Sequence, residues 1–202
     1  MDESTTKMKP KLLIIAGPNG SGKTSVTSKI LKHEWVKGCV YINPDNIARD
    51  LYGDWNAPNA VMKAVRYAAT QRELCLKNRE DLLFETVLSA KDKLDFITKA
   101  KDLGYFIRLF FVGTDHPTIN ARRIAKRVLE GGHDVPISKI MSRYSKSIAN
   151  CAQAATFVHR LYVYDNSTEN AFPKLLFRAA DGMVEKTYAE INTWAQEILR
   201  VL

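Results

Sequence analysis

Cysteine is scarce in this sequence, and long apolar runs are missing from it. The chain has three cysteines among 202 residues, and Cys39, Cys75 and Cys151 stand far apart. An odd, scattered set of thiols argues against a disulfide framework and is typical of proteins in a reducing compartment. No apolar stretch approaches the ~20 residues of a membrane-spanning helix, and the polar start MDESTTKMKPK lacks the apolar region of a secretory signal. We therefore expect a cytoplasmic protein that does not act at a membrane.

Acidic residues are also in the minority. The chain has 22 Asp and Glu against 30 Lys and Arg, which gives a formal net charge of +8 at pH 7. This balance favours acidic partners, but it does not distinguish a polynucleotide from a small phosphorylated metabolite. The sequence contains no internal repeat, low-complexity segment or interdomain linker. Its length predicts one α/β domain over residues 11–202, after a disordered lead-in at residues 1–10.

Short apolar runs alternate with segments of helical periodicity along most of the chain. We expect strands at residues 11–17, 38–43, 81–85, 105–113 and 160–167. We expect helices at residues 23–32, from Pro44 onward, and at 60–78, 91–103, 117–129 and 137–158. A turn at Asp181-Gly182 predicts a β-hairpin, and a last helix is expected at residues 187–201. The alternation predicts a three-layer α/β sandwich with a mostly parallel five-stranded sheet, followed by the hairpin and the last helix.

One segment combines backbone freedom with positive charge: IIAGPNGSGKTSVTSK, at residues 14–29. It contains the pattern G-x-x-x-x-G-K-T between a predicted strand and a predicted helix, which is the context that a phosphate-binding P-loop requires. In such a loop the backbone N–H groups and the helix N-terminus surround phosphates, and Lys23 adds a full charge. A glycine-rich turn with an accidental lysine is the alternative, and the context disfavours it. We predict that ATP is bound by Gly17, Pro18, Asn19, Gly20, Ser21, Gly22, Lys23, Thr24 and Ser25, with the Thr24 hydroxyl on Mg²⁺.

Two carboxylates lie at the ends of predicted strands, Asp45 just past one strand and Glu85 as the last residue of another. Asp45 lies in YINPDNIA, and Glu85 lies in LLFETVLS with Thr86 beside it. Because ligands gather at the carboxyl ends of parallel strands, we expect both acids to face the cavity at the P-loop. Asp45 is a candidate for accepting the proton of an acceptor hydroxyl, Glu85 for binding the substrate or a Mg²⁺-bound water, and Thr86 for binding the substrate. The alternatives are a first-turn helix carboxylate for Asp45 and a capping or ion-paired acid for Glu85.

A basic segment follows: NARRIAKRVLEGGHDVPISKIMSRYSKS. Arg123 and Arg127 are four residues apart and therefore share a helix face. A Gly-Gly break follows them, and Arg143 begins a second basic series. We predict a lid over about residues 117–150 that closes on ATP and brings guanidinium groups to the transferring phosphoryl group. A solvated basic face is the alternative, and His133 in the break is equally well a loop histidine without a role.

The last predicted strand ends in VYDNS. At this place in a nucleotide-binding fold, the Asn166 amide is a candidate ligand for the adenine ring. A simple turn formed by the Asp-Asn pair is an equally good interpretation.

Together these segments resemble the zeta toxin family in its short, single-domain form. The matching segments, in chain order, are GPNGSGKTS, YINPDNIA, FETVLS, RVLEGGHDVPISKIMSRYSKS and VYDNS. Many families share the P-loop, but GGHDVP followed by R-Y-x-K-S is far more specific. The resemblance covers residues 11–167 and implies an ATP-dependent P-loop kinase. In the toxin branch of the family, the acceptor is the 3′-hydroxyl of the amino sugar in UDP-N-acetylglucosamine.

Carried over by position, the resemblance implies a set of site residues: Lys23 and Thr24 in the P-loop, Asp45 as general base, Glu85 as substrate-contacting acid and Arg127 as first lid arginine. The second lid arginine of the family falls nearest His133, and Arg143 is the other candidate for that charge. Val87 stands where the family often has Thr, so one hydroxyl contact to the substrate is absent. The chain has no toxin-neutralising segment, and an antitoxin protein stays open as a partner.

Three functions compete at this stage. The first is a small-molecule kinase whose acceptor is a sugar nucleotide. The second is a nucleic-acid-end kinase or RNA-binding NTPase, which the net charge of +8 motivates. The sequence shows no clear basic stretch interleaved with aromatic residues, so we rank nucleic acid lower. The third is a nucleotide-binding regulator without enzymatic activity.

Overall fold

The computed structural model describes residues 9–53 and 56–202, and a single seven-stranded sheet runs through them in the order β2-β3-β1-β4-β5-β6-β7. The parallel strands are β1 (Lys11–Ala16), β2 (Val40–Ile42), β3 (Leu82–Thr86), β4 (Phe106–Gly113) and β5 (Arg160–Asp165). The antiparallel strands are β6 (Lys174–Ala180) and β7 (Met183–Thr187). The predicted hairpin therefore extends the parallel sheet at β5, so the sheet has seven strands and not five. Residues 1–8 of the predicted lead-in lie outside the described residues.

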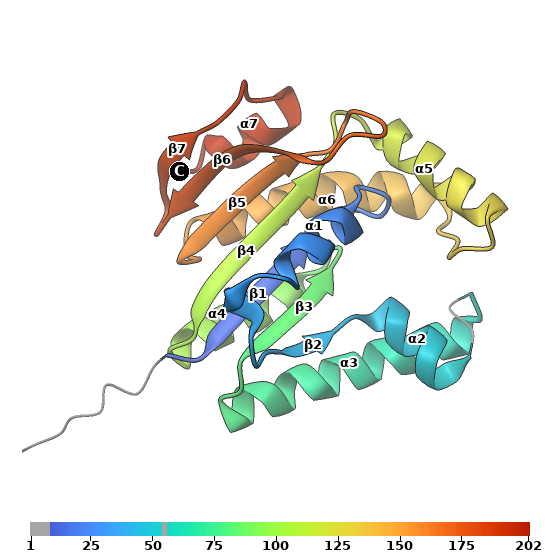
Figure 1. Ribbon diagram of the computed structural model, residues 1–202, viewed down its shortest axis with the longest axis horizontal. Helices are drawn as coiled ribbons and strands as arrows, with labels where there is room; N and C mark the ends of the chain where they lie inside the picture. The colour runs from blue at the N-terminus through green and yellow to red at the C-terminus, as the bar shows by residue number, and fades with distance from the viewer. Residues whose placement is uncertain (1–8, 54–55) are drawn as a thin grey trace, which may run out of the picture.

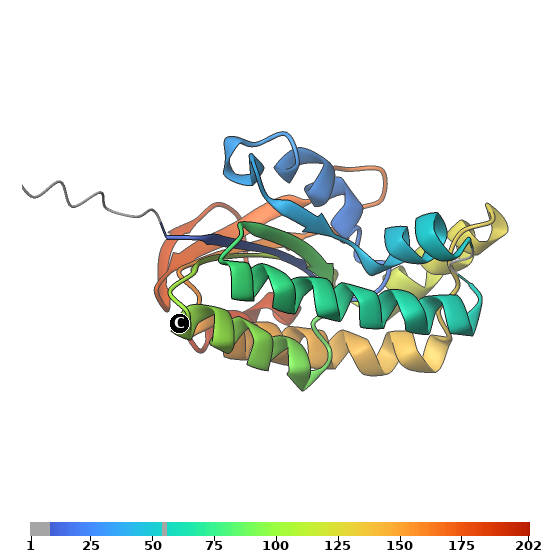
Figure 2. The same ribbon diagram turned by 90° about the horizontal axis from the view of Figure 1, so that it is seen from below.

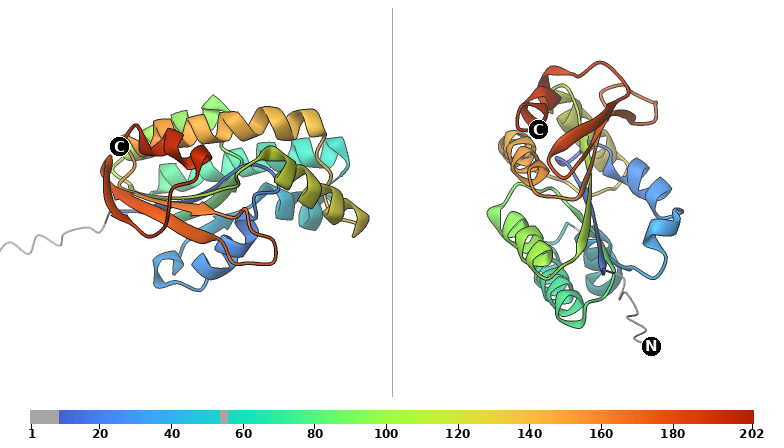
Figure 3. Two further views of the ribbon diagram at one scale, coloured as in Figure 1. Left: turned by 90° about the horizontal axis from the view of Figure 1, so that it is seen from above. Right: turned by 90° about the vertical axis from the view of Figure 1, so that its left-hand side faces the viewer.

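Helices cover the two faces of the sheet unequally. Those of the described chain are α1 (Lys23–Ile30), α2 (Pro44–Tyr52), α3 (Pro58–Asn78), α4 (Lys91–Asp102), α5 (Pro117–Leu129), α6 (Ile137–Ala155) and α7 (Thr193–Leu199), with a short 3₁₀ turn η1 (Glu34–Val36). Figures 2 and 3 show α3, α4 and α6 together on one face, with α1 and η1 on the other. Within the described ranges, none of the helices combines the length and apolar character needed to cross a bilayer.

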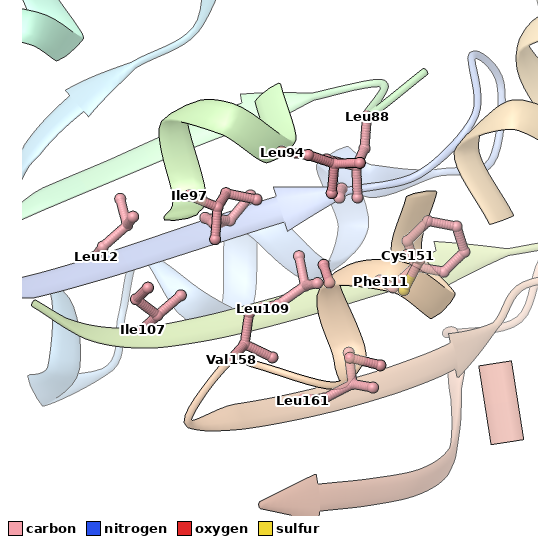
Figure 4. Close-up of a cluster of buried hydrophobic side chains, with 14 of the residues drawn as sticks. Leu12, Leu88, Leu94, Ile97, Ile107, Leu109, Phe111, Cys151, Val158 and Leu161 are labelled. Atoms are coloured by element: carbon pink, nitrogen blue, oxygen red, sulfur yellow. The ribbon is translucent and has the colours of Figure 1, made fainter. Parts of the chain in front are cut away.

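The two faces of the sheet carry separate hydrophobic clusters. In β1, Leu12 and Ile14 belong to the larger cluster under α4 and α6, whereas Leu13 and Ile15 belong to the smaller cluster under α1. Figure 4 shows the larger cluster, where Leu12, Ile107, Leu109 and Leu161 of the sheet meet Leu94, Ile97, Cys151 and Val158. A parallel strand buried on both faces reads as a continuous apolar run, which is why LLIIA was recognisable in the sequence. The end of β1 is therefore a fixed point from which the P-loop starts.

The last helix is shorter than predicted. We expected it from residue 187, but Thr187 pairs with Phe177 in the hairpin and the Tyr188 N–H donates to the Leu176 carbonyl at 2.7 Å. The helix begins at Thr193 and buries Trp194, Ala195 and Ile198 against the larger cluster. The first residues of the predicted helix therefore belong to the β-hairpin. The local sequence pattern permitted a helix there because it does not contain the backbone pairing with β6.

The loops that follow the parallel strands lie at one edge of the sheet, where the carboxyl ends of these strands meet. In Figure 1 the arrowheads of β1, β3 and β4 point toward the side of the molecule where α2 and α5 lie. The P-loop after β1, the N-terminus of α2 and the end of β3 meet at this edge. In an open parallel sheet this is the edge where ligands bind.

Candidate active site

The loop between β1 and α1 has the geometry of an anion site. Gly17 has φ +149°, and a Cβ there would stand 2.2 Å from the Val112 carbonyl oxygen. Gly22 has φ +88°, and a Cβ there would stand 2.1 Å from Asn166 Nδ2. Only glycine fits both conformation and space at these two positions. Gly22 is also the N-cap of α1, where no side chain in the described chain caps the helix and no acid occupies the first turn. The first N–H groups of α1 are therefore open to an anion.

Lys23 closes this loop with its own ammonium group. Its Nζ donates to the Gly17 carbonyl at 2.9 Å and to the Pro18 carbonyl at 3.1 Å. Burial lowers the pKa of Lys23, and the nearby carboxylates of Glu85 and Asp45 oppose that shift. The cation of the P-loop and the two predicted acids therefore belong to one electrostatic site.

The two acids are linked through β2. Glu85 is the second-last residue of β3, and its Oε1 accepts from the Tyr41 hydroxyl at 2.5 Å and from Asn43 Nδ2 at 3.0 Å. Asn43 is the N-cap of α2, and its Oδ1 accepts from the Asp45 N–H at 2.9 Å and the Asn46 N–H at 3.3 Å. Asp45 is exposed in the first turn of α2, where a carboxylate interacts favourably with the helix dipole, as in the alternative interpretation of this residue. It also lines the cavity described below. Burial and the neighbouring Glu85 carboxylate raise the pKa of Tyr41.

The predicted lid comprises α5, the Gly-Gly break and most of α6. Arg127 donates through Nε at 3.1 Å and Nη2 at 2.7 Å to the His133 carbonyl, so its guanidinium holds the break against α5. Arg143 in α6 donates to Asn19 Oδ1 at 3.2 Å and so contacts the P-loop. From Tyr144 onward α6 is anchored: the Tyr144 hydroxyl donates to the Thr114 carbonyl at 2.5 Å, and Tyr144 is buried. This anchored part of α6 lies within the range of about residues 117–150 predicted for the lid.

One cavity of about 590 Å³ brings most of the predicted residues together. Of those residues, the cavity is lined by Asn19, Gly20, Gly22, Lys23, Thr24, Asp45, Glu85, Arg127 and His133. The sequence-based reasoning missed further lining residues: Tyr41, Asn43, Asn46 and Arg49 in the segment of β2 and α2, Thr27, Ser28 and Leu31 around α1, and Ile124 from α5. Arg123, which that reasoning placed in the basic lid with Arg127, also lines the cavity. Tyr41 and Asn43 stand in the same YINPDNIA segment as Asp45, and only the alternation along β2 could have indicated that they share a face.

Seven predicted residues lie outside this lining: Gly17, Pro18, Ser21 and Ser25 of the P-loop, and Thr86, Arg143 and Asn166. Thr86 turns its Oγ1 to the Leu88 N–H, from which it accepts at 3.0 Å. Arg143 reaches the cavity only through Asn19. Asn166 donates to the Ser21 carbonyl at 2.8 Å and lines a second hollow of about 390 Å³.

This second hollow adjoins the first across α5. Both contain Gly22, Arg123 and Arg127, and the second adds Ser25, Lys126 and Glu130 together with Asn166 and residues 168–171. Arg123 Nη2 donates to the Thr168 carbonyl at 3.2 Å, and its buried Nη1 has no hydrogen-bond partner in the described ranges.

The residues present suit Mg²⁺ only with help from phosphate. Within the part of the chain that the structure describes, no group of three His, Cys, Asp or Glu side chains could hold a metal ion. Mg²⁺ is usually bound in kinases by one or two protein oxygens, with phosphate and water oxygens completing its shell. The exposed Thr24 hydroxyl, which lines the cavity in the first turn of α1, fits that pattern.

Comparisons with known proteins agree with this geometry. The family model described as zeta toxin matches residues 1–174. An uncharacterized protein of Haemophilus influenzae is 28% identical over 137 residues, which are 68% of this chain and 94% of that protein.

Solved structures share the fold at low identity. A chain of the AvrRxo1-ORF1:-ORF2 complex with ATP has a TM-score of 0.66 at 16% identity, over 97% of this chain and 64% of its own length. A chain from the PezAT chromosomal toxin-antitoxin system of Streptococcus pneumoniae has a TM-score of 0.59 at 18% identity, over 96% of this chain and 85% of its own. These likenesses confirm the predicted α/β fold. Because the family model matches most of the sequence, the chain belongs to the zeta toxin family.

Proposed function

We propose that the protein is an ATP-dependent kinase that transfers the γ-phosphate to a hydroxyl of a sugar nucleotide, with the 3′-hydroxyl of UDP-N-acetylglucosamine as the expected acceptor. One observation carries the proposal: Lys23 and Thr24 line the same cavity as Asp45 and Glu85. Phosphoryl transfer requires groups that bind the phosphates and a base for the acceptor hydroxyl within one enclosed site. Family membership supports the reaction class, and the identity of the acceptor rests on the family resemblance.

The P-loop side of the cavity would hold the donor. The N–H groups at the start of α1 and the Lys23 ammonium bind the phosphates, and Lys23 exchanges its two carbonyl partners for phosphate oxygens as it does so. The Thr24 hydroxyl would hold Mg²⁺, which neutralises charge on the β- and γ-phosphates when bound. Asn166 and the loop that follows it would lie against the base.

The opposite side of the cavity would hold the acceptor. Glu85 accepts a hydrogen bond from an acceptor hydroxyl and orients the sugar. Asp45 takes the proton of the attacking acceptor hydroxyl. The oxygen of that hydroxyl forms a bond to the γ-phosphorus, while the bond from the γ-phosphorus to the oxygen that bridges it to the β-phosphate breaks. The products are ADP and a phosphorylated acceptor. The charge that develops on the transferring group is then met by cations of α5.

Among those cations we assign direct contact to Arg127 and Arg123, which both line the cavity. Arg143 touches Asn19 and so supports the P-loop, and His133 lines the cavity beside Arg127. The second lid charge of the family therefore has three candidates in this chain: His133, Arg143 and Arg123. The family resemblance pointed to the first two, and the cavity lining adds Arg123.

The test is a mass measurement of the acceptor. The purified chain is incubated with ATP, Mg²⁺ and UDP-N-acetylglucosamine, and the sugar nucleotide should gain one phosphate. Asp45→Asn should retain ATP binding and lose transfer, whereas Lys23→Ala should lose both. Parallel reactions contain a metabolite extract or an oligonucleotide with a free 5′-hydroxyl. Phosphate gained only by the oligonucleotide would replace the sugar nucleotide by a nucleic-acid end, and no phosphorylated species in any reaction would overturn the kinase.

An antitoxin is the proposed protein partner. The PezAT structure is that of a toxin-antitoxin system, and the AvrRxo1 structure is a complex of two proteins. If this chain acts as a toxin of the same kind, its expression in a bacterial host should slow growth, and the Lys23→Ala variant should not. Equal growth with both chains would remove the toxin role and with it the need for an antitoxin.

A further inference from the structure

We propose that Asn43 is a positioning residue that sets the spacing between the base Asp45 and the acceptor-binding Glu85, and that Tyr41 and Asn43 together orient the Glu85 carboxylate. The inference rests on the proposed kinase function. It concerns residues that the family resemblance did not assign. All four side chains line the cavity of about 590 Å³.

Both ends of the Asn43 amide are engaged. Its Oδ1 accepts from the Asp45 N–H at 2.9 Å and the Asn46 N–H at 3.3 Å, which fixes the first turn of α2. Its Nδ2 donates to Glu85 Oε1 at 3.0 Å and lies 3.2 Å from the Tyr41 hydroxyl oxygen. One side chain therefore starts the helix that carries Asp45 and also contacts the end of the strand that carries Glu85.

The sheet register brings the two residues of this contact side by side. Strands β2 and β3 run parallel with Tyr41 opposite Leu83 and Ile42 opposite Phe84, so residue 43 follows beside residue 85. Tyr41 and Asn43 are two positions apart, and side chains at that spacing lie on one face of a strand. The phenol and the amide thus approach the same carboxylate oxygen from one side.

This arrangement leaves one oxygen of Glu85 for a ligand. Oε1 accepts from two donors of the protein itself, whereas no hydrogen bond joins Oε2 to any of the described residues. A carboxylate whose rotation is stopped by two donors presents its second oxygen in a fixed direction. In a cavity that also contains Asp45, that direction determines which acceptor hydroxyl lies beside the base.

Asparagine is the side chain that meets both demands. A serine would cap α2 as well, but it lacks a second donor for Glu85. An aspartate would also cap the helix, but it would place a second carboxylate against Glu85. If Asn43 were a helix cap and nothing more, serine would serve equally well. The Asn43→Ser variant therefore separates capping from positioning.

The kinetic test compares Asn43→Ser and Tyr41→Phe with the unmodified chain, using ATP, Mg²⁺ and UDP-N-acetylglucosamine. Because a displacement of about 1 Å at the reacting groups lowers a rate by about 100-fold, Asn43→Ser should lower kcat by about 10- to 100-fold with the Kd of ATP unchanged. Tyr41→Phe should mainly raise the KM for the acceptor. The matched control is Asn78→Ser, an exposed position at the end of α3, which should keep full activity. Full activity of Asn43→Ser would overturn the inference.

A double-mutant cycle tests whether Asn43 acts through Glu85. The kcat loss of Asn43→Ser should largely vanish when Glu85 is already Ala, because Asn43 then has no acceptor oxygen at that position. Additive losses would show that Asn43 acts elsewhere and would overturn the inference.

A second measurement separates this inference from the proposed function. If the unmodified chain phosphorylates no acceptor, the kinase proposal fails, and crystal structures of the unmodified chain and the Asn43→Ser variant decide the positioning role alone. We expect the Glu85 carboxylate to rotate and its distance from Asp45 to change in the variant. Unchanged positions of both carboxylates would overturn the role of Asn43.

Discussion

Asn166 donates its Nδ2 hydrogen to the Ser21 carbonyl at 2.8 Å, and this buried bond joins the loop after β5 to the P-loop, 145 residues earlier in the chain. The same Nδ2 stands where a side chain on Gly22 would begin. The Asn166 amide therefore holds the backbone of the P-loop in place, and it also lines the hollow proposed for the base. Asn166 thus links the two halves of the proposed nucleotide site.

Removal of this amide should weaken both stability and ATP binding. In Asn166→Ala the buried Ser21 carbonyl loses its donor, and an unsatisfied buried acceptor costs about 1–3 kcal/mol of unfolding free energy. Denaturant unfolding measures that loss, and calorimetric titration measures the accompanying rise in the Kd of ATP. Asn78→Ala, an exposed change, is the control. An unfolding free energy equal to that of the unmodified chain would show that the bond does not hold the P-loop.

The last helix supports the same loop, although it lies beyond the residues that match the family model. Trp194 Nε1 donates to Asp165 Oδ1 at 3.0 Å, and Asp165 also accepts from the Ser167 hydroxyl at 2.6 Å and the Ser167 N–H at 3.1 Å. Gly113 allows the indole to approach, because a Cβ there would stand 2.3 Å from its ring. The indole therefore fixes the carboxylate that orders the start of the base-side loop.

Trp194→Phe keeps an aromatic ring and removes the donor. Because Asp165 is buried, we expect a loss of about 1–3 kcal/mol in unfolding free energy. The Kd of ATP should rise as well, since the loop that begins at Asn166 loses its support. Tyr188→Phe, at an exposed tyrosine in the preceding segment, should stay within about 0.5 kcal/mol of the unmodified chain. Equal stability of the two variants would contradict this role of the indole.

The sequence predicted those features of the fold and the site that depend on residues close together in the chain. The P-loop is recognisable because a buried strand, glycines and a helix start follow one another within sixteen residues, 14–29. Asp45 and Glu85 were selected because Asp45 follows a predicted strand and Glu85 is the last residue of another. In both cases the chemical signal and the structural context lie in the same short segment.

The rest depends on contacts across the sheet. The network of Tyr41, Asn43 and Glu85 follows from the register of β2 against β3, which local patterns do not contain. The contacts of Arg143 with Asn19 and of Asn166 with Ser21 join segments more than a hundred residues apart. The start of the last helix was wrong for the same reason, because pairing of Thr187 with Phe177 decides it.

The buried ammonium of Lys23 should show in the pH dependence of stability. Burial lowers the pKa of Lys23 from its ordinary value of 10.5, so the folded chain binds this proton less tightly than the unfolded chain does. The unfolding free energy therefore rises with pH between the lowered folded pKa and 10.5. Relative to Lys23→Met, the unmodified chain should gain stability as the pH rises through this window.

Denaturant unfolding of both chains at several pH values up to 10.5 checks this prediction for Lys23. A stability difference that stays constant, or that changes in favour of Lys23→Met, would contradict it. Lys32→Met, an exposed position after α1, is the control for activity and should leave ATP turnover unchanged.

Arg127 makes a contact that lysine cannot copy. Its Nε and Nη2 both donate to the His133 carbonyl, and the forked guanidinium can do so while its remaining N–H groups stay in the cavity. In Arg127→Lys the charge is kept but the break after α5 loses one of its two bonds, and the cation no longer has a fixed direction. Removal of one such preorganised donor lowers kcat by about 10²- to 10³-fold, and we expect a loss near the lower end of that range. Arg122→Lys, at an exposed neighbour that pairs with Glu169, should leave kcat unchanged. If both variants kept full kcat, α5 would not contribute a cation to the transferring group, and the lid would serve only to cover the site.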